Sequence, residues 1–386
     1  MKKQTILYFM SIISIIIFFG LFVSCSTENN ALGDTTEAAA DVDSGEAINS
    51  AAQPINIENA NEIGKVKTLN LSSIGDNYII EKSDGDSTSV EITGHEDFVD
   101  LIKMDYSAET GTLRIYYDKG KAAKLDRNKW DDSKNIIKVK IAYDGESPEN
   151  LIFRVEGSGS INLSVPFKKL NMHANGSGMI NAPNISVEDI DVVINGSGNI
   201  NFNDANYCNI TINGSGSAKF NHAENSVITV NGSGDINFKS SGSCDVTING
   251  SGNVSGAGKI NLLNSAINGS GDMKFSECDK FTGSISGSGD ITVDKVNESI
   301  SATIISQDGS SNSNANIEIK SGEVETFYSY IYNKSSSNKP VIAAENVTAD
   351  NAEITIEDIG TVKIKKVNND LIQNCGENSN LIVSEE

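Results

Sequence analysis

The sequence predicts an all-β protein wound as a parallel β-solenoid, and two observations carry this prediction. The tripeptide Gly-Ser-Gly recurs eight times, at intervals of 18 to 20 residues, between residues 157 and 289. Apolar residues stand at even distances before and after each copy, which is the period of a β-strand. A unit of this length cannot bury an apolar face alone, so stacked units must share one core.

Each Gly-Ser-Gly is predicted to form a corner between two strands. Val, Ala or Ile stands two positions before the first glycine, as at Ile212, and apolar residues stand four and six positions after it, as at Ile236 and Phe238. Both glycines stand at even distances from these apolar residues, so they are predicted to point inward, where a side chain would fill the inside of a sharp bend. Glycine also permits backbone dihedrals that other residues rarely adopt. The predicted corner glycines are Gly157, Gly159, Gly176, Gly178, Gly196, Gly198, Gly214, Gly216, Gly232, Gly234, Gly250, Gly252, Gly269, Gly271, Gly287 and Gly289.

The residues between these glycines are predicted to face outward. Six of the eight copies read Asn-Gly-Ser-Gly, and stacked asparagine amides can hydrogen-bond from coil to coil. We expect this row to stabilise the solenoid. A functional alternative is a flat polar face that contacts a glycan or a protein. The Asn-Gly-Ser triplets also match the eukaryotic glycosylation sequon. A bacterial lipoprotein, as the amino terminus suggests, would not meet that glycosylation machinery.

The amino terminus reads as a secretory signal. Lys2 and Lys3 precede an apolar run from Ile6 to Val23, and Cys25 follows shortly after. The break before Cys25 resembles the lipobox of bacterial lipoproteins, with Phe22 where leucine is usual. This resemblance implies lipidation of Cys25 and a protein attached to the outer membrane by lipid, on the cell surface or the periplasmic face. The alternative is an uncleaved transmembrane anchor, for which the run is at the short end of spanning length.

Four regions follow from these patterns. Residues 1–24 are the signal peptide, and residues 25–62 are the lipidated cysteine and an acidic tether that lacks Lys and Arg and is predicted to be disordered. Residues 63–296 form the solenoid head. Residues 297–386 keep alternating runs without the glycine corners, which predicts irregular coils with a loop at Gly309–Asn314. A cap is expected there because an open solenoid end exposes unpaired backbone.

Two repeat segments carry a specific resemblance. Leu151–Ile161 and Ile194–Phe202 resemble the head domain of putative auto-transporter adhesins, called the GIN domain, and residues 67–71, 89–94 and 112–117 resemble that family's opening strands. The resemblance covers roughly residues 64–296. It implies a right-handed β-helix similar in shape to pectin lyases, without known catalytic residues. The adhesive role it implies is itself inferred from architecture.

The charge balance excludes some partners. The 386 residues include 30 basic and 52 acidic side chains, a formal net charge of −22. Such a chain repels nucleic-acid phosphates and anionic lipid headgroups. We expect no nucleic-acid partner, and a protein or glycan ligand instead. Arginine occurs only at Arg114, Arg127 and Arg154.

We expect neither catalysis nor a cofactor. None of the histidines (His95, His173 and His222) shares a repeat column with a serine or cysteine that the repeat marks, as a nucleophile and its base would require. His173 and His222 are expected on solvated faces. A carbohydrate-active β-helix enzyme with paired carboxylates remains an alternative, because acidic residues are plentiful.

A column of oxygen-bearing side chains raises the question of a metal. Asp235, Asn253, Asp272 and Asp290 stand three positions after consecutive corner glycines. Stacked carboxylates repel each other unless a cation neutralises them, and Ca²⁺ prefers such ligands. The favoured interpretation is an exposed row screened by water, salt, Lys259 and Lys274, so no metal site is predicted.

The cysteines predict no disulfide. Cys208 and Cys244 share a column but stand two coils apart, about 9–10 Å at the strand spacing, which is too far for a bond. Cys278 and Cys375 have no evident partner, so buried free thiols are expected. The sequence as a whole predicts a lipid-anchored, extracytoplasmic solenoid that presents a rigid acidic surface for adhesion or envelope binding. The alternatives are a carbohydrate-active enzyme and a structural lipoprotein that faces the periplasm.

Overall fold

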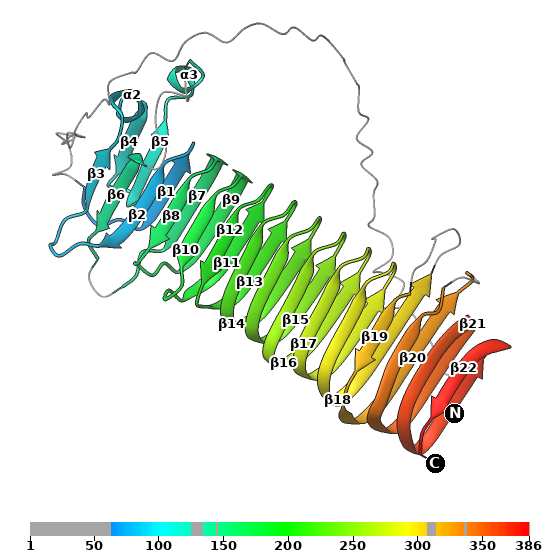
Figure 1. The fold of residues 1–386 in the computed structure, drawn as a ribbon. Helices are drawn as coiled ribbons and strands as arrows, with labels where there is room; N and C mark the ends of the chain where they lie inside the picture. The colour runs from blue at the N-terminus through cyan, green and yellow to red at the C-terminus, as the bar shows by residue number, and fades with distance from the viewer. Residues whose placement is uncertain (1–62, 125–133, 144–145, 307–313, 336–337, 386) are drawn as a thin grey trace, which may run out of the picture. The chain divides into compact units, whose positions relative to one another are not determined.

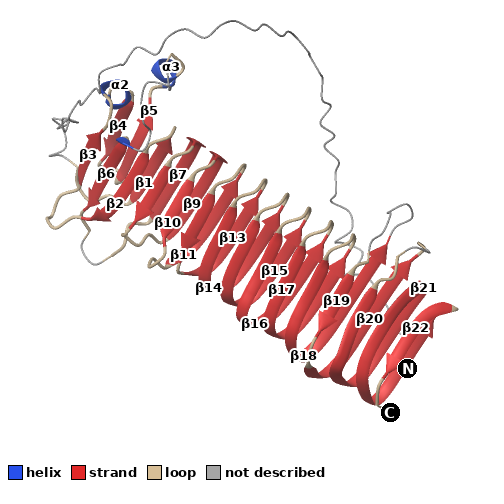
Figure 2. Ribbon diagram, viewed as in Figure 1, coloured by secondary structure: helices blue, strands red, loops and turns tan. Residues whose placement is uncertain are grey.

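The computed structural model describes residues 63–385, apart from residues 125–133, 144–145, 307–313 and 336–337. The predicted signal peptide, Cys25 and the tether lie outside these residues, as do residues 309–313 of the predicted loop. Contacts divide the chain into residues 1–50 and 51–386, and the fold belongs to the second unit. Strands make up nearly all of its regular structure (Figure 2). The described residues contain no helix with the length and apolar character needed to cross a membrane.

The centre of the fold is a stack of parallel coils in which each strand pairs with its equivalents in the coils before and after (Figure 1). Register partners such as Ile210, Ile228 and Val246 stand 18 residues apart. This pairing confirms the parallel β-solenoid. The strands are β7 (Asn150–Gly157), β8 (Ser160–Leu163), β9 (Lys169–Gly176), β10 (Met179–Ala182), β11 (Val187–Ile194), β12 (Asn199–Phe202), β13 (Asp204–Ile212), β14 (Ser217–Val230), β15 (Asp235–Ile248), β16 (Asn253–Ile267), β17 (Asp272–Ile285) and β18 (Asp290–Ser306).

The core runs along the inside of this stack as columns of apolar residues. The positions two before and four after each corner glycine are buried throughout, from Val155 and Ile161 to Ile285 and Ile291. In the next column the rings of Phe202, Phe220 and Phe238 lie parallel, with centroids 5.2 and 5.0 Å apart. This is close to the spacing of paired strands, so one ring stacks on the next with each coil.

Gly256 interrupts the column of rings for a steric reason. A Cβ atom at Gly256 would lie 3.0 Å from the rings of both Phe238 and Phe275. These two rings therefore close over the glycine, with centroids 6.3 Å apart. The apparent defect in the repeat is a place where the neighbouring side chains fill the core.

Each coil bends at more places than the glycine corner. In β14 the buried positions are 218, 220, 223, 226, 228 and 230, so the inward spacing changes from two residues to three at two points. A three-residue step turns the chain while the backbone stays paired with the next coil. These bends leave no glycine signature, and the sequence therefore shows only one of the turns in each coil.

The glycine corners are held together by backbone contacts between coils. The amide of Ser233 donates to the carbonyl of Gly214 at 2.8 Å, and the amide of Ser251 donates to Gly232 at 2.8 Å. Gly232 has φ +149°. A Cβ atom there would lie 2.5 Å from the Gly214 carbonyl oxygen. Close stacking and an unusual dihedral both call for glycine at this position.

The amino-terminal end departs from the repeat. Its elements are β1 (Thr68–Ser73), β2 (Asn77–Lys82), β3 (Ser89–Thr93), α2 (Glu96–Val99), β4 (Ile102–Ser107), β5 (Thr112–Tyr117), α3 (Lys119–Ala122) and β6 (Ile136–Ile141). Strands β5 and β6 lie parallel to β1 and β2, on the side away from β7 and β8. Strands β4 and β3 then add to β5 and β6 in antiparallel orientation. These two strands cover the backbone edge that a simple coil would leave open.

The carboxyl-terminal coils continue the stack without glycine corners. They comprise β19 (Asn316–Ile319), β20 (Gly322–Asn333), β21 (Val341–Cys375) and β22 (Asn378–Val383). Asn333 and Asp358 occupy the column of Gly287, and Asp358 takes the left-handed conformation with φ 70°. The buried Asn333 amide donates to the carbonyls of Asn338 and Ile359, at 3.1 and 3.0 Å. Leu371 and Ile372, near the end of β21, are exposed, so no element of the described residues covers them. The cap expected at this end therefore stays a prediction.

The corner geometry can be tested with Gly232→Ala. We expect a loss of about 1–3 kcal/mol in the free energy of unfolding, because the methyl group meets the Gly214 carbonyl and the dihedral is strained. The measurement is denaturant unfolding of the chain from Ser26 onward. The exposed neighbour substitution Ser233→Ala is the control and should change little. Equal stability of the two variants would contradict the corner.

Candidate binding surface

The predicted asparagine row is a continuous ladder on the outer surface. The side-chain amide of each residue donates to the amide oxygen one coil earlier, at distances of 2.7 to 2.9 Å. The members in order are Asn175, Asn195, Asn213, Asn231, Asn249 and Asn268. An amide suits this role because it carries both donors and an acceptor, so one copy can satisfy the next.

The ladder has a direction and a defined end. All of its amide groups donate toward the amino-terminal end, and the first, Asn175, donates to the carboxylate of Glu156 at 3.2 Å. Aligned hydrogen bonds polarise one another, and here their positive ends point at a carboxylate. The first copy of the repeat has Glu156 in place of asparagine. A carboxylate accepts hydrogen bonds and has no N–H group to satisfy, so the ladder can end there.

The column of Asp235, Asn253, Asp272 and Asp290 stacks as predicted. Its side chains do not surround a common point where a metal ion could bind. Asn253 separates Asp235 from Asp272 and donates to Asp235 at 2.9 Å. Lys259 pairs with Asp279 at 2.8 Å, so it does not neutralise this column as we had expected. The described residues hold no group of three His, Cys, Asp or Glu side chains arranged around a common point.

Asp272 and Asp290 are the two carboxylates that stack directly. The amide of Asp290 donates to the Asp272 carboxylate at 3.2 Å. Partial burial raises the pKa of Asp290, and the negative charge of Asp272 raises it further. Ionisation of Asp290 is therefore disfavoured in the folded state.

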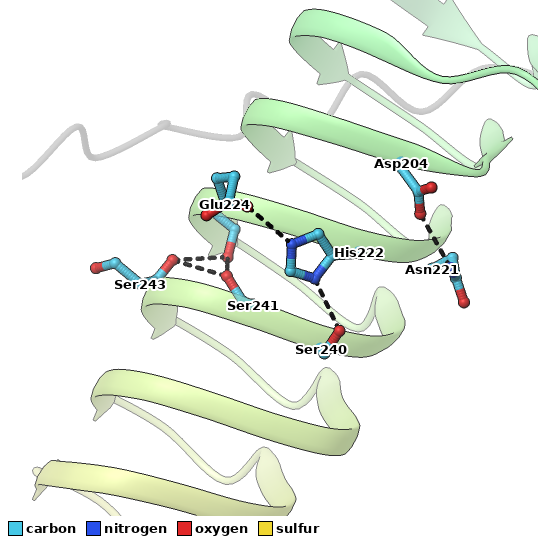
Figure 3. A network of polar contacts seen from close by, with 8 residues as sticks. Asp204, Asn221, His222, Glu224, Ser240, Ser241 and Ser243 are labelled. Carbon is cyan, nitrogen blue, oxygen red and sulfur yellow. Dashed lines mark hydrogen bonds and ion pairs between the residues drawn. The ribbon is translucent and has the colours of Figure 1, made fainter.

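The histidines differ in their surroundings. His95 caps helix α2, and its Nδ1 accepts from the amide of Asp97 at 3.2 Å. His173 is exposed. His222 lies between two polar partners (Figure 3), with Nδ1 at 2.8 Å from the hydroxyl of Ser240 and Nε2 at 3.5 Å from Glu224. The sequence analysis missed this contact, because it compared the histidines only with the serines and cysteines that the repeat marks. Ser240 stands one coil, 18 residues, after His222.

The Ser240–His222–Glu224 arrangement resembles the order of groups in a hydrolase triad, but its surroundings do not favour catalysis. The Glu224 side chain is 66% exposed, so it positions the imidazole weakly. The three residues lie on paired strands and line neither of two cavities near the amino-terminal coils.

The cysteines of the described chain are free. Cys208 and Cys244 stack on either side of Ser226, which agrees with the predicted column. Burial raises the pKa of Cys244 and of Cys278 to about 12, and it also raises that of Cys208. These buried thiols stay protonated and pack as small apolar residues. Cys375 is exposed, in contrast to the expectation that the thiols are buried.

The repeat segment matches one protein family. Residues 140–222 and 210–310 both match the family described as "Putative auto-transporter adhesin, head GIN domain". The match leaves out the opening strands that the sequence analysis compared with this family, and it extends beyond residue 296 into the following coil.

The chain also matches solved structures that are described as putative adhesins. A putative adhesin from Bacteroides fragilis is 18% identical, with 63% of this chain and 95% of that chain covered and a TM-score of 0.40. Putative adhesins from Parabacteroides distasonis and Parabacteroides merdae are 14% and 15% identical, cover 78% and 82% of this chain and 95% of their own, and have TM-scores of 0.36 and 0.35. No curated protein matches the chain.

The ladder can be tested at two positions. Asn231 makes two ladder hydrogen bonds, so Asn231→Ala should lower the free energy of unfolding by about 1–2 kcal/mol. Asn268 makes one, so Asn268→Ala should cost about half as much. Denaturant unfolding measures both. Equal losses at the two positions would indicate that the ladder hydrogen bonds do not determine the effect.

The stacked carboxylates predict a pH dependence. The pKa of Asp290 is higher in the folded state than in the unfolded state, so ionised Asp290 lowers the free energy of unfolding. This loss is absent at pH values below the pKa of the unfolded state and is complete above the pKa of the folded state. Asp290→Asn should therefore raise the melting temperature at pH 7 and have little effect near pH 3. Asp84→Asn removes an exposed charge in the loop after β2 and is the control. A melting temperature at pH 7 unchanged by Asp290→Asn would contradict the interpretation.

Proposed function

We propose that this protein is a lipid-anchored, extracytoplasmic binding module of the adhesin type, and that it catalyses no reaction. The observation that carries the proposal is the GIN head-domain match over residues 140–310. The parallel solenoid supplies a rigid body on which outward side chains repeat at fixed spacing. Such a body suits display of a surface to another molecule.

The amino-terminal sequence supports the anchor and the compartment. A basic start, an apolar run and a break before Cys25 form the pattern of a lipoprotein signal. The acidic segment 26–62 is proposed to tether the head.

The surface of the repeat supports binding over catalysis. The asparagine ladder and the Ser255–Asn237 pair make hydrogen bonds between coils, and other outward positions carry charged side chains such as Lys219 and Lys274 that are exposed to a ligand. The polar contact of His222 with Ser240 lies on an open face and lacks the enclosure that hydrolysis requires. A carbohydrate-active enzyme and a structural lipoprotein that faces the periplasm are the competing functions.

Protease treatment of intact cells tests the location that adhesion requires. We expect protease to cut the head or its tether on whole cells, as detected by blotting for the head. A lysed sample and a periplasmic marker protein are the controls. Cutting only after lysis would place the head in the periplasm and would contradict adhesion.

The anchor is tested separately with Cys25→Ser. This substitution removes the thiol that the lipid would modify, so the protein should move from the membrane fraction to the soluble fraction. Cys375→Ser removes the exposed thiol of the last coils and should leave the protein in the membrane fraction. Retention of the Cys25→Ser protein in the membrane would contradict lipid anchoring.

A further inference from the structure

A cavity of about 270 Å³ opens on the outer face of the amino-terminal coils, across strands β5, β1 and β7. Two arginines enter it from opposite sides of β1. Arg114 of β5 is the register partner of Asn70, and Arg154 of β7 is the register partner of Ser72. The two side chains come from positions 40 residues apart in the sequence, and only the doubling back of β5 against β1 brings them together.

This gathering of cations is unusual in so acidic a chain. The sequence contains three arginines, and the third, Arg127, lies outside the described residues. Lys119 of α3 adds a further positive charge to the cavity. Many lysines elsewhere in the described chain have a carboxylate partner, such as Lys169 with Asp189 at 2.8 Å. Within that part of the chain, neither Arg154 nor Lys119 has a carboxylate within 4.0 Å.

Contacts hold both arginine side chains in place but leave some of their N–H donors without a partner among the described residues. Arg154 donates to the Asn70 side-chain oxygen at 3.1 Å, which uses one of the five N–H donors of a guanidinium. Arg114 lies over the ring of Tyr116, 5.1 Å from its centroid, and 4.0 Å from Asp105. Both members of that ion pair are more than half exposed, so it contributes little and leaves donors for a ligand.

The other walls suit a sugar. Tyr116 and Tyr117 also line the cavity, and aromatic rings offer apolar surface to the C–H groups of pyranose rings. Glu156 is held by Asn175 at the end of the asparagine ladder, so its carboxylate is placed to accept hydrogen bonds from hydroxyl groups. A fork of arginine N–H groups binds a carboxylate through two parallel hydrogen bonds.

We propose that this cavity binds a sugar residue that carries one carboxylate, a uronic acid or a sialic acid, as part of a glycan. The inference rests on the proposed binding function and names its ligand class. The carboxylate would lie between Arg154 and Arg114, and the hydroxyl groups would face Glu156 and Asn70. A singly charged acid suits the site better than a phosphate dianion, because the carboxylates of Asp105 and Glu156 repel the second charge.

Titration of the full-length chain with trigalacturonate and 3′-sialyllactose tests the site, with lactose as the neutral sugar and 3′-sulfated lactose, which carries a sulfate and no carboxylate, as the other anion. We expect binding of at least one carboxylated sugar and none of lactose. Arg154→Gln should weaken that binding about tenfold or more, since a hydrogen-bonded charge contact is lost. Arg154→Lys keeps the charge without the fork and should fall between the two.

Lys219→Gln is the matched control, because it removes one exposed positive charge from β14, outside the cavity, and should leave affinity within about twofold, as expected for weak surface electrostatics. Arg114→Gln provides a second variant if Arg154→Gln melts at a lower temperature. Failure of both carboxylated sugars to bind, equal losses in Arg154→Gln and Lys219→Gln, or binding of the sulfated lactose alone would each overturn the proposal.

The outcome is separable from that of the proposed function. If no acidic sugar binds but protease cuts the head on intact cells, the ligand assignment fails and the adhesive function stands. If an acidic sugar binds through Arg154 but the head is cut only after lysis, the site stands and adhesion at the cell surface fails.

Discussion

In-register stacking of each residue on its equivalent one coil away is the constraint on which the rest of the structure depends. Any side chain that recurs at a fixed position must tolerate a copy of itself at the strand spacing. Ile and Phe do so inside, where the rings of Phe202, Phe220 and Phe238 stack in parallel. Asparagine does so outside, because its amide both donates and accepts. Carboxylates tolerate such stacking poorly. Asn253 separates Asp235 from Asp272, and Asp290, which stacks directly on Asp272, has a raised pKa.

The same constraint decides which features the sequence reveals. Periodic features leave a signal at a fixed interval, and the glycine corners, the apolar columns and the asparagine ladder were all predictable for that reason. Features that occur once leave no periodic signal, and strand β3 was expected only from the family resemblance of residues 89–94. The antiparallel strands β3 and β4, the Asn333 side chain that replaces a glycine corner, and the left-handed Asp358 satisfy the backbone where the repeat stops. The His222–Ser240 contact lies between these cases, since its interval of 18 residues is periodic but its residue types are not repeated.

The corner and the ladder support each other. Close stacking of the Gly214 and Gly232 backbones lets consecutive corners hydrogen-bond directly, and this fixes the distance between Asn213 and Asn231, whose amides meet at 2.8 Å. The aligned amides then require an acceptor at the amino-terminal end of the row. Glu156 provides it, so a residue that breaks the repeat motif completes the hydrogen bonding of the residues that obey it.

Regularity also determines where a specific site can form. Stacked coils of nearly equal length present even faces, and their polar groups are used between coils, so the repeat body offers few free donors in a concave setting. At the amino-terminal end the chain doubles back, β5 pairs with β1, and Arg114 and Arg154 line one cavity from the strands on either side of β1. The repeat body is therefore the scaffold, where substitutions change stability. On the proposal of an acidic-sugar site, the non-repeating end is where substitutions change recognition, because there Arg114, Arg154 and Glu156 line one cavity without being stacked on copies of themselves.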